Sequence, residues 1–374
     1  MLIGIRVDAS LKMGTGHTFR MLTLASRLHQ KGHEIVFICR RLKGNLIALV
    51  KEKHSVIELP EPDVDFVPSI HCEHAAWLEV SYDQEITQTR DALTLYLKSK
   101  GRSQLDWLAI DHYAIEKSFQ LALKPHSKNI LQIDDLADRQ HICDVLLDQN
   151  FYRSGETRYD GLLPPESLRL CGPRYALLRE EFAVSRRNLL AYQSRLIQRK
   201  VVLFFGGVDI ANETEKALRG LLSVDSDDYF DVIIGMNNPH REALAALCNE
   251  HLDRVALHVQ VKNMMDFFSS AYLYVGAVGA TTWERCVLAL PGIVCSVAAN
   301  QTQVAEDLDR IQAHQYLGLN TTLTSKDYAD AYISLISKPE LLRQQSQRCA
   351  ELIDGEGCER VVKQLEEISK YDQV

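Results

Sequence analysis

Short runs of apolar residues alternate with longer segments in which apolar residues recur every three or four positions. The short runs predict buried strands at 3–8, 34–39, 55–59, 107–111, 129–133, 145–147, 201–205, 230–234, 255–259, 272–275 and 293–297. The longer segments predict helices, among them 17–31, 45–53, 83–100, 177–200 and 212–222. Strands that alternate with helices in this way predict an α/β fold with parallel sheets.

The order strand, glycine turn, helix occurs twice, over 3–20 and again over 201–222. Because 374 residues exceed one ordinary core, we expect two doubly wound, Rossmann-like α/β domains that face each other across a cleft. The expected boundaries are a first domain over 1–180, a connecting helix over 181–199 and a second domain over 200–350. The amphipathic segment 351–374 is expected to pack back toward the first domain.

Charge and cysteine usage narrow the class of protein. Lysine and arginine total 42 against 50 acids, and a net charge of −8 argues against nucleic acid as a partner. The nine cysteines show no C-x-x-C spacing and lie mostly in apolar runs, as reduced core thiols do. No apolar stretch reaches the roughly 18 residues of a membrane helix. We therefore expect a cytoplasmic protein without a membrane partner; its oligomeric state is left open.

The turn Gly14-Thr15-Gly16-His17 follows the first predicted strand and opens the first predicted helix. Glycines let backbone N–H groups approach a ligand, and a helix N-terminus favours an anion such as phosphate. The turn is neither a G-x-G-x-x-G fingerprint nor a P-loop, because Arg20 stands at the third glycine position and no Gly-Lys-Ser/Thr follows. His17 is therefore a candidate proton acceptor, with helix capping as the simpler interpretation.

A second glycine loop, 276–284, follows the predicted strand 272–275. The amides around Gly279 and the hydroxyls of Thr281 and Thr282 suit phosphate oxygens, and Glu284 could accept ribose hydroxyl protons. A capped helix with a solvated acid is the alternative. Asn300 and Gln301, after the next strand, can both donate to and accept from sugar hydroxyls.

Two patterns resemble metal sites. His71-Cys72-Glu73-His74 contains ligand types but lies in an irregular loop without a fourth ligand, so no zinc site is expected. Asp134 and Asp135 are adjacent, and adjacent strand residues point to opposite faces, which favours loop capping over a shared ion.

The ordered set of motifs resembles a known family, the UDP-2,4-diacetamido-2,4,6-trideoxy-β-L-altropyranose hydrolases of pseudaminic-acid biosynthesis. The motifs that carry the resemblance are 6–10, 14–17, 39–40, 111–113, 133–138, 172–182, 205–209, 238–240, 276–286 and 300–301, which together cover most of the chain. The resemblance implies a GT-B fold, shared with the UDP-GlcNAc-using transferase that completes lipid II.

The resemblance also implies a reaction and its residues. His17 matches the general base that activates water to release UDP and the free sugar, with inversion and without a metal or other cofactor. Gly206 and Gly207, like Gly14 to Gly16, match loops beside the diphosphate. Glu284 matches the ribose-binding acid, and Asn300 and Gln301 match a group near the diphosphate and sugar. Val278 and Ala280 depart from the expected loop pattern, which leaves the phosphate contacts open.

Three more residues near the first loop are candidates for substrate binding. Asp8 could orient His17, hold a sugar group or cap the turn. Arg6, from the same strand, could equally be a structural ion-pair partner. Tyr113, at the end of another first-half strand, could line the sugar pocket.

Two other classes of function compete with hydrolysis. A GT-B glycosyltransferase would use the same UDP-sugar and pass the sugar to an acceptor. A nucleotide-sugar binding or regulatory protein would bind without turnover, which leaves His17 at the phosphate loop unexplained.

Overall fold

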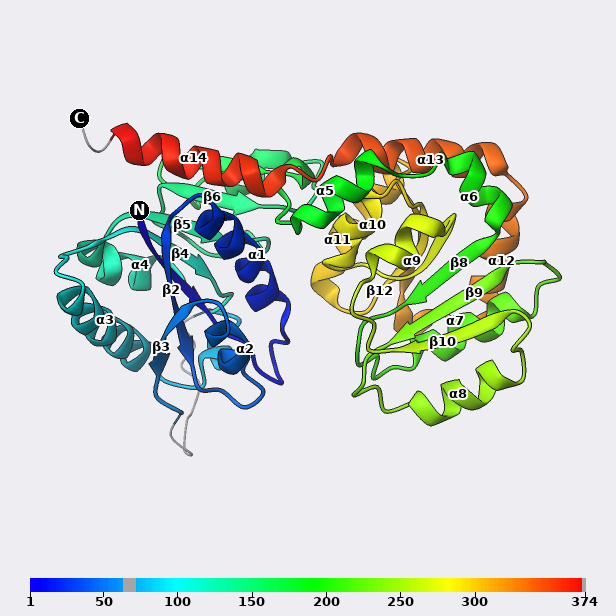
Figure 1. Ribbon diagram of the computed structural model, residues 1–374, viewed down its shortest axis with the longest axis horizontal. Coiled ribbons are helices and arrows are strands. Elements are labelled where there is room, and N and C mark those ends of the chain that lie inside the picture. The colour runs from blue at the N-terminus through cyan, green and yellow to red at the C-terminus, as the bar shows by residue number, and fades with distance from the viewer. Residues whose placement is uncertain (63–71, 372–374) are drawn as a thin grey trace. The chain divides into compact units, whose positions relative to one another are not determined.

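The computed structural model describes residues 1–62 and 72–371, which divide into two compact units (Figure 1). Unit 1 comprises 1–150, 154–178 and the segment from 357 onward; unit 2 comprises 151–153 and 179–356. Each unit is built on one sheet of parallel strands.

Unit 1 holds, among its described residues, a seven-stranded sheet in the order β3-β2-β1-β4-β5-β6-β7. Its strands are β1 (Leu2–Val7), β2 (Glu34–Arg40), β3 (Ser55–Leu59), β4 (Leu105–Asp111), β5 (Ser127–Ile133), β6 (Val145–Asp148) and β7 (Leu168–Cys171). Its helices are α1 (Gly16–Gln30), α2 (Ile47–Lys51), α3 (Tyr82–Ser99), α4 (Lys117–Leu123) and α14 (Gly357–Tyr371), with short 3₁₀ turns at η1 (Ala75–Leu78), η2 (Lys124–His126), η3 (Gly155–Tyr159) and η4 (Pro173–Tyr175).

Unit 2 repeats the plan with six described strands in the order β10-β9-β8-β11-β12-β13. They are β8 (Lys200–Phe204), β9 (Tyr229–Ile234), β10 (Val255–Val259), β11 (Leu273–Ala277), β12 (Gly292–Ser296) and β13 (Gln315–Leu319). The helices are α5 (Glu180–Arg187), α6 (Tyr192–Gln198), α7 (Glu213–Leu222), α8 (Arg241–Asn249), α9 (Met265–Ser270), α10 (Thr281–Val287), α11 (Thr302–Arg310), α12 (Ser325–Ile336) and α13 (Pro339–Leu352), with 3₁₀ turns at η5 (Ala299–Gln301) and η6 (Asn320–Thr322).

Both sheets reverse their direction of growth beside the first strand of the unit. In unit 1 the chain runs outward through β1, β2 and β3, then returns to place β4 on the other side of β1. Unit 2 does the same with β8 and β11. Such reversals leave a crevice at the carboxyl ends of the two central strands, where open α/β sheets bind ligands.

Helix α14 completes the core of unit 1, although it follows unit 2 in the chain (Figure 1). Its buried residues Cys358, Val361, Val362 and Leu365 recur at helical spacing and pack in one cluster with strand residues such as Ile3. Its outer residue Glu359 accepts hydrogen bonds from Arg27 and Lys31, the latter at 2.7 Å. The first and last helices of the described chain therefore share one core.

The segment 177–200, expected to be a single helix, forms α5 and α6 with a break between them. Each helix has its own anchors in unit 2. Arg186 of α5 donates to the carbonyls of Val287 and Ala350, and Arg195 of α6 donates to that of Ala271. These tertiary bonds outweigh the helical propensity of the segment. Strands β7 and β13 are additional to the strands that the sequence predicts.

Candidate active site

The carboxyl ends of β1 and β4 bring the side chains of His17, Arg20 and Asp111 together in unit 1. The loop after β1 leads to Gly14, whose backbone has φ +77°, and α1 begins two residues later at Gly16. Among the described residues, no atom beyond the chain neighbours lies within 4 Å of a Cβ added at either glycine, and Gly14, Thr15 and Gly16 are all exposed. The turn therefore presents open backbone beside His17.

His17 is fixed by a carboxylate from the neighbouring strand. Its Nδ1 lies 2.7 Å from Oδ1 of Asp111, the last residue of β4, and its side chain is almost fully buried. Burial opposes ionisation of Asp111, but the facing Arg20 and His17 hold its pKa well below the usual range. An ionised carboxylate can only accept a hydrogen bond, so Nδ1 carries the proton and Nε2 is left with a lone pair. The imidazole is thus presented as a base through Nε2.

Arg20, one turn further along α1, binds the same carboxylate with two donors. Its Nε lies 2.9 Å from Oδ2 of Asp111 and its Nη2 lies 2.7 Å from Oδ1. The same Nη2 approaches Nδ1 of His17 to 3.3 Å, and Nη1 lies 3.6 Å from Asp135. Paired N–H groups of arginine match a carboxylate in geometry, which fixes both orientation and charge.

Aromatic rings surround the imidazole. Tyr113 meets His17 edge to face at 4.6 Å between ring centroids, and its hydroxyl donates to Asp135 Oδ1 at 2.5 Å. Trp77 stacks on Tyr113 at 5.5 Å, and His74 lies against both rings, at 4.8 Å from Trp77. Tyr113, predicted to line the sugar pocket, is therefore in direct contact with the candidate base.

Arg6 and Asp8 belong to a different, fully buried network. Asp8 accepts from Arg6 Nη2 at 2.7 Å and from the Arg40 backbone N–H at 2.7 Å. Arg6 also donates to Glu85 at 2.8 Å, and His112 lies 3.5 Å from Asp8. The sequence left Asp8 as a candidate partner of His17, but the structure gives that place to Asp111. Since both side chains are enclosed in unit 1, their arrangement is that of structural ion pairs.

The glycine loops of unit 2 follow the two central strands of its sheet. Gly206 has φ +103°, and the Gly207 carbonyl accepts from the Gly235 N–H at 2.8 Å, which joins the loops after β8 and β9. Gly279 donates its N–H to the Thr282 hydroxyl at 3.2 Å, and Thr281 begins α10. These residues form two adjoining turns at the carboxyl ends of the central strands β8 and β11.

The two departures from the expected loop pattern have different structural settings. Val278 is buried, and its N–H donates to the Cys295 carbonyl at 3.0 Å, so that amide is unavailable to a phosphate. Ala280 is exposed immediately before α10. The amide of Val278 is therefore unavailable to a phosphate, and Gly279 and Thr282 likewise use their N–H groups within the loop.

Glu284 and Gln301 also follow the carboxyl ends of strands in unit 2, in α10 after β11 and in η5 after β12. Glu284 lies one turn into α10 and is half-buried; burial raises its pKa to about 7, against the opposing effect of Arg179. The Gln301 side chain accepts from the Val297 N–H at 2.9 Å and its Nε2 lies near Gly279. Asn300 is exposed beside it in η5. A carboxyl, two amides and a glycine loop thus adjoin one another.

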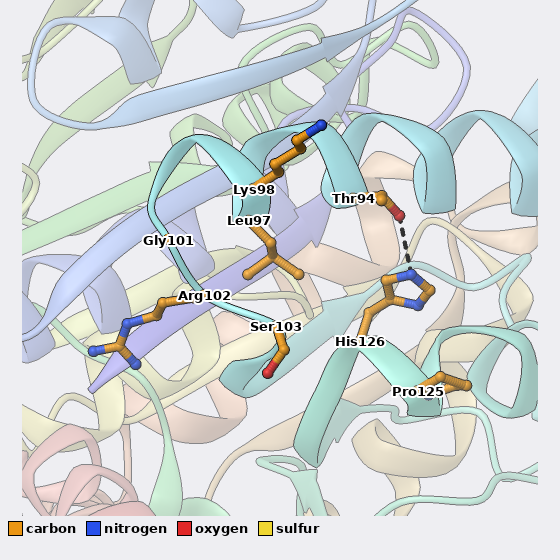
Figure 2. Close-up of a pocket in the computed structure, with 8 residues that line it drawn as sticks. All are labelled: Thr94, Leu97, Lys98, Gly101, Arg102, Ser103, Pro125 and His126. Atoms are coloured by element: carbon orange, nitrogen blue, oxygen red, sulfur yellow. Dashed lines mark hydrogen bonds between the residues drawn. The ribbon is translucent and has the colours of Figure 1, made fainter.

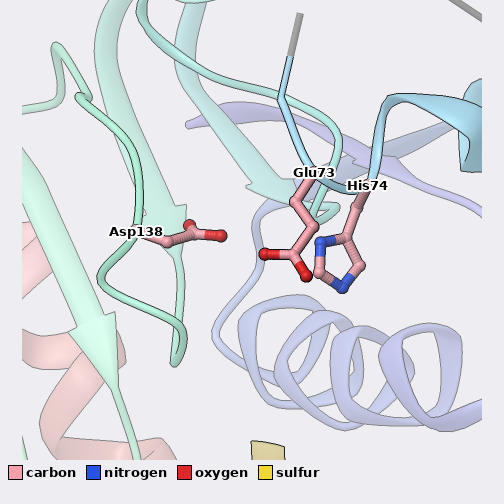
Figure 3. A group of neighbouring side chains, drawn as sticks. All are labelled: Glu73, His74 and Asp138. Carbon is pink, nitrogen blue, oxygen red and sulfur yellow. The ribbon is translucent and has the colours of Figure 1, made fainter. Parts of the chain in front are cut away.

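The described part of the predicted metal-like loop brings Glu73 and His74 toward Asp138, with ligand atoms within 4.8 Å of one another (Figure 3). Asp138 already binds Arg139 Nη1 at 2.6 Å, and both acids are exposed. The guanidinium already supplies positive charge to Asp138 at that position. His71 lies outside the described residues. Asp134, the other metal-like candidate, accepts from the Ala137 N–H and pairs with Arg139, which is a loop-capping arrangement.

A pocket of about 620 Å³ lies at the opposite edge of the unit 1 sheet, before β4 and β5 (Figure 2). Its lining includes Thr94, Lys98, Arg102 and His126. Thr94 and His126 bond to each other, while Lys98 and Arg102 extend in different directions (Figure 2). The cations do not converge on one ligand position, and the pocket is remote from the strand ends that hold His17.

Asp111, Arg20, Asp135 and Trp77 are site residues that the sequence reasoning did not assign. A signal for Asp111 was available, because it ends a buried strand and the fold places that strand beside β1. Arg20 lies one helical turn from His17 and so had to share its face. Nothing in the spacing of Trp77 indicates its place beside Tyr113.

Comparisons with known proteins define the fold. No protein-family profile matches the chain. An uncharacterized protein of Methanocaldococcus jannaschii is 24% identical over 79% of this chain, and the match spans 55% of that protein. The UDP-2,4-diacetamido-2,4,6-trideoxy-β-L-altropyranose hydrolase of Campylobacter jejuni is 26% identical over 71% of this chain and 80% of its own length.

Two solved structures align with nearly the whole chain. MurG of Acinetobacter baumannii has a TM-score of 0.69 at 14% identity, covering 98% of this chain and 99% of its own. Phytolacca americana UGT2, complexed with UDP-2-fluoro-glucose and pterostilbene, has a TM-score of 0.71 at 12% identity and covers 99% of each. The chain therefore has the GT-B fold, with two Rossmann-like domains on parallel sheets. No helix in the described residues has the length and apolarity to span a membrane.

Proposed function

We propose that this protein hydrolyses a UDP-linked 2,4-diacetamido-2,4,6-trideoxy sugar to UDP and the free sugar, in the biosynthesis of pseudaminic acid. The observation that carries the proposal is the 2.7 Å contact between His17 Nδ1 and Asp111, which leaves Nε2 as the ring atom that can accept a proton. The name of the Campylobacter relative supports the substrate class.

The chemistry requires a base and a stabilised leaving group. His17 Nε2 takes a proton from water as the water oxygen attacks the anomeric carbon and the bond from that carbon to the UDP oxygen breaks. Attack opposite the departing UDP inverts the anomeric centre. The proton then resides on an imidazolium whose Nδ1–H remains bonded to Asp111. His17 is therefore protonated after each turnover and must release that proton to solvent before the next one.

Unit 2 offers the groups that a uridine diphosphate requires. The loops at Gly206 and Gly207 and at the start of α10, where Thr281 is partly exposed, suit the diphosphate, whose negative charge grows as the bond breaks; Thr282 is buried and supports the second loop through its bond with Gly279. Glu284 in its ionised form would accept from the ribose, and Asn300 and Gln301 suit the diphosphate and sugar. Donors that are already in place need no metal ion to act.

A GT-B glycosyltransferase is the second candidate, and it is favoured by the fold of MurG and of UGT2. A transferase would use the same UDP-sugar but direct His17 at the hydroxyl of an acceptor. The two functions therefore differ in the nucleophile, which an assay can separate.

The test incubates the purified protein with the UDP-sugar, a chelator and no acceptor. We expect UDP and free sugar in equal amounts. His17→Asn is expected to lower kcat by at least about 10²-fold, the usual loss when a general base is removed. His29→Asn, at an exposed position of the same helix, is the matched control and is expected to turn over normally.

UDP release that begins only when an acceptor is added would replace hydrolysis by transfer. Near-normal turnover by His17→Asn would remove His17 from the role of base.

A further inference from the structure

We propose that Arg20 is a positioning residue for His17: it holds the Asp111 carboxylate in place and offsets the negative charge of that carboxylate at the imidazole. The inference rests on the proposed function, because it assigns Arg20 a part in the same proton transfer. It concerns only side chains of unit 1.

The contacts place Arg20 between two carboxylates. It binds both oxygens of Asp111, at 2.9 and 2.7 Å, and lies 3.6 Å from Asp135. Asp111 binds His17, and Asp135 accepts the hydroxyl of Tyr113, whose ring touches the imidazole. One guanidinium therefore orients the hydrogen-bond partners of both rings.

The charge of Arg20 opposes that of Asp111 at the imidazole. A bare carboxylate 2.7 Å from Nδ1 would stabilise the imidazolium and so keep His17 protonated. The guanidinium, 3.3 Å from the same nitrogen, repels the positive charge that the ring gains when Nε2 is protonated. With Arg20 bound to it, Asp111 keeps the hydrogen bond that orients His17, while the guanidinium offsets the negative charge of the carboxylate.

The surroundings of the imidazole contain few other charges that could take over this task. Arg20 is the cation that α1 contributes, and the end of β4 contributes Asp111 and the neutral phenol of Tyr113. The loop after β5 contributes Asp135, and η1 with its N-cap contributes Trp77 and His74. Arg139 lies over the Tyr113 ring at 6.0 Å but pairs with Asp134 and Asp138. Among the described contacts, a neutral residue at position 20 would therefore leave Asp111 facing the imidazole without a cation of its own.

The experiment compares Arg20→Gln, which removes the charge, with Arg20→Lys, which keeps the charge but loses the fork. Ring ¹⁵N signals of labelled histidine are followed over pH without substrate, and the His17 signal is identified by its loss in His17→Asn among 13 histidines. The pH dependence of kcat/KM is measured in parallel.

We expect Arg20→Gln to move both the His17 titration and the acid limb of the rate profile to higher pH by about one unit, because the imidazolium then has no nearby charge of its own sign to repel it. Arg20→Lys is expected to leave both within a few tenths of a unit. Its kcat should fall severalfold at unchanged KM, because the carboxylate is held less firmly. A purely structural arginine would lower activity at every pH without moving either midpoint.

Coincident His17 titrations in the parent and Arg20→Gln would overturn the proposal. If Arg20→Gln does not fold, Arg20→Met, which also removes the charge, takes its place: an unmoved His17 midpoint would overturn the proposal, and a midpoint moved to higher pH supports it. A shifted titration in a protein that hydrolyses no UDP-sugar would retain the role of Arg20 and reject the proposed reaction.

Discussion

At the scale of single residues, the carboxyl group of Glu284 changes its charge in the range where the protein would work. Burial raises its pKa to about 7, well above that of an exposed glutamate. The sign follows from this shift: the folded state favours the protonated form, so the contribution to stability is present below about pH 4.5 and is lost as the pH rises through 7. The ionised form offers both oxygens as acceptors to two hydroxyls, whereas the protonated form uses one oxygen as a donor.

We predict that UDP binds more tightly at pH 8 than at pH 6, by severalfold, because binding a ribose favours the ionised carboxylate. Isothermal titration calorimetry at constant ionic strength measures the change. Glu284→Gln is the matched control, since it retains shape but cannot titrate, and any remaining slope belongs to the phosphates of UDP. Equal slopes in both proteins would separate Glu284 from the ribose.

Residue assignments that depended on the neighbouring strand could not come from local spacing. Gly14, Gly16 and His17 were found because a strand, a glycine turn and a helix adjoin in sequence. Asp111 is 94 positions from His17, and the two meet only because β4 returns to the free side of β1. Asp8 was an alternative partner through sequence proximity alone, and the buried arginines around it claim both of its oxygens.

At the scale of elements, the turn between β1 and α1 depends on two glycines for different reasons. Gly14 has φ +77°, a left-handed conformation that side chains rarely adopt, whereas Gly16 lies at the start of α1 outside that region. Neither position is crowded. Conformation rather than space therefore distinguishes them.

We predict that Gly14→Ala destabilises unit 1 by about 1 kcal/mol, the cost of a left-handed alanine. Gly16→Ala should be neutral or stabilising by a few tenths to about 1 kcal/mol, because alanine restricts the unfolded chain and fits a helix. Urea unfolding followed by the fluorescence of the buried Trp107, in a background with phenylalanine at the other two tryptophan positions, reports on unit 1. Equal effects of the two substitutions would show that the turn relaxes when Gly14 is replaced.

Most strands could be predicted because buried parallel strands are short β-branched runs, as at Glu34–Arg40. Strands β7 and β13 lie at the sheet edges and are partly exposed, so their apolar signal is weak. The break between α5 and α6 carries no glycine or proline, and the contacts that cause it come from residues about 80 to 160 positions away.

At the scale of the whole molecule, the buried acids whose pKa is lowered by facing arginines are concentrated in unit 1. There, burial opposes ionisation of Asp8, Glu85, Asp111 and Asp134, yet the arginines hold the pKa of each below its usual range. Their stabilising effect is present above about pH 4 and is lost as the pH falls below it. Asp148 is the exception in unit 1, because burial and the nearby Asp135 raise its pKa to about 7. In unit 2 the pKa of Glu284 is raised, and the lowered pKa values of Glu215 and Asp327 belong to more exposed groups.

We therefore predict that acid unfolds unit 1 before unit 2. The chain has three tryptophans, and Trp107 in unit 1 and Trp283 in unit 2 are both buried. Two variants that each keep one of these tryptophans as the single fluorophore, with phenylalanine at the other positions, report the transitions separately. A common midpoint, or earlier loss of the Trp283 signal, would contradict the charge argument.

The late position of α14 has a consequence for synthesis on the ribosome. A nascent chain that has exposed its first 178 residues still lacks the helix that covers Ile3 and Leu24 and bonds Trp107 through Ser369. Residues 179–356, about half of the protein, must still be translated before that helix emerges, so the apolar residues that it covers in the first domain stay exposed while the later domain can already fold. Chaperones that bind exposed apolar segments have their longest opportunity there, and any stop codon ahead of residue 357 would leave the N-terminal half as the part that is degraded.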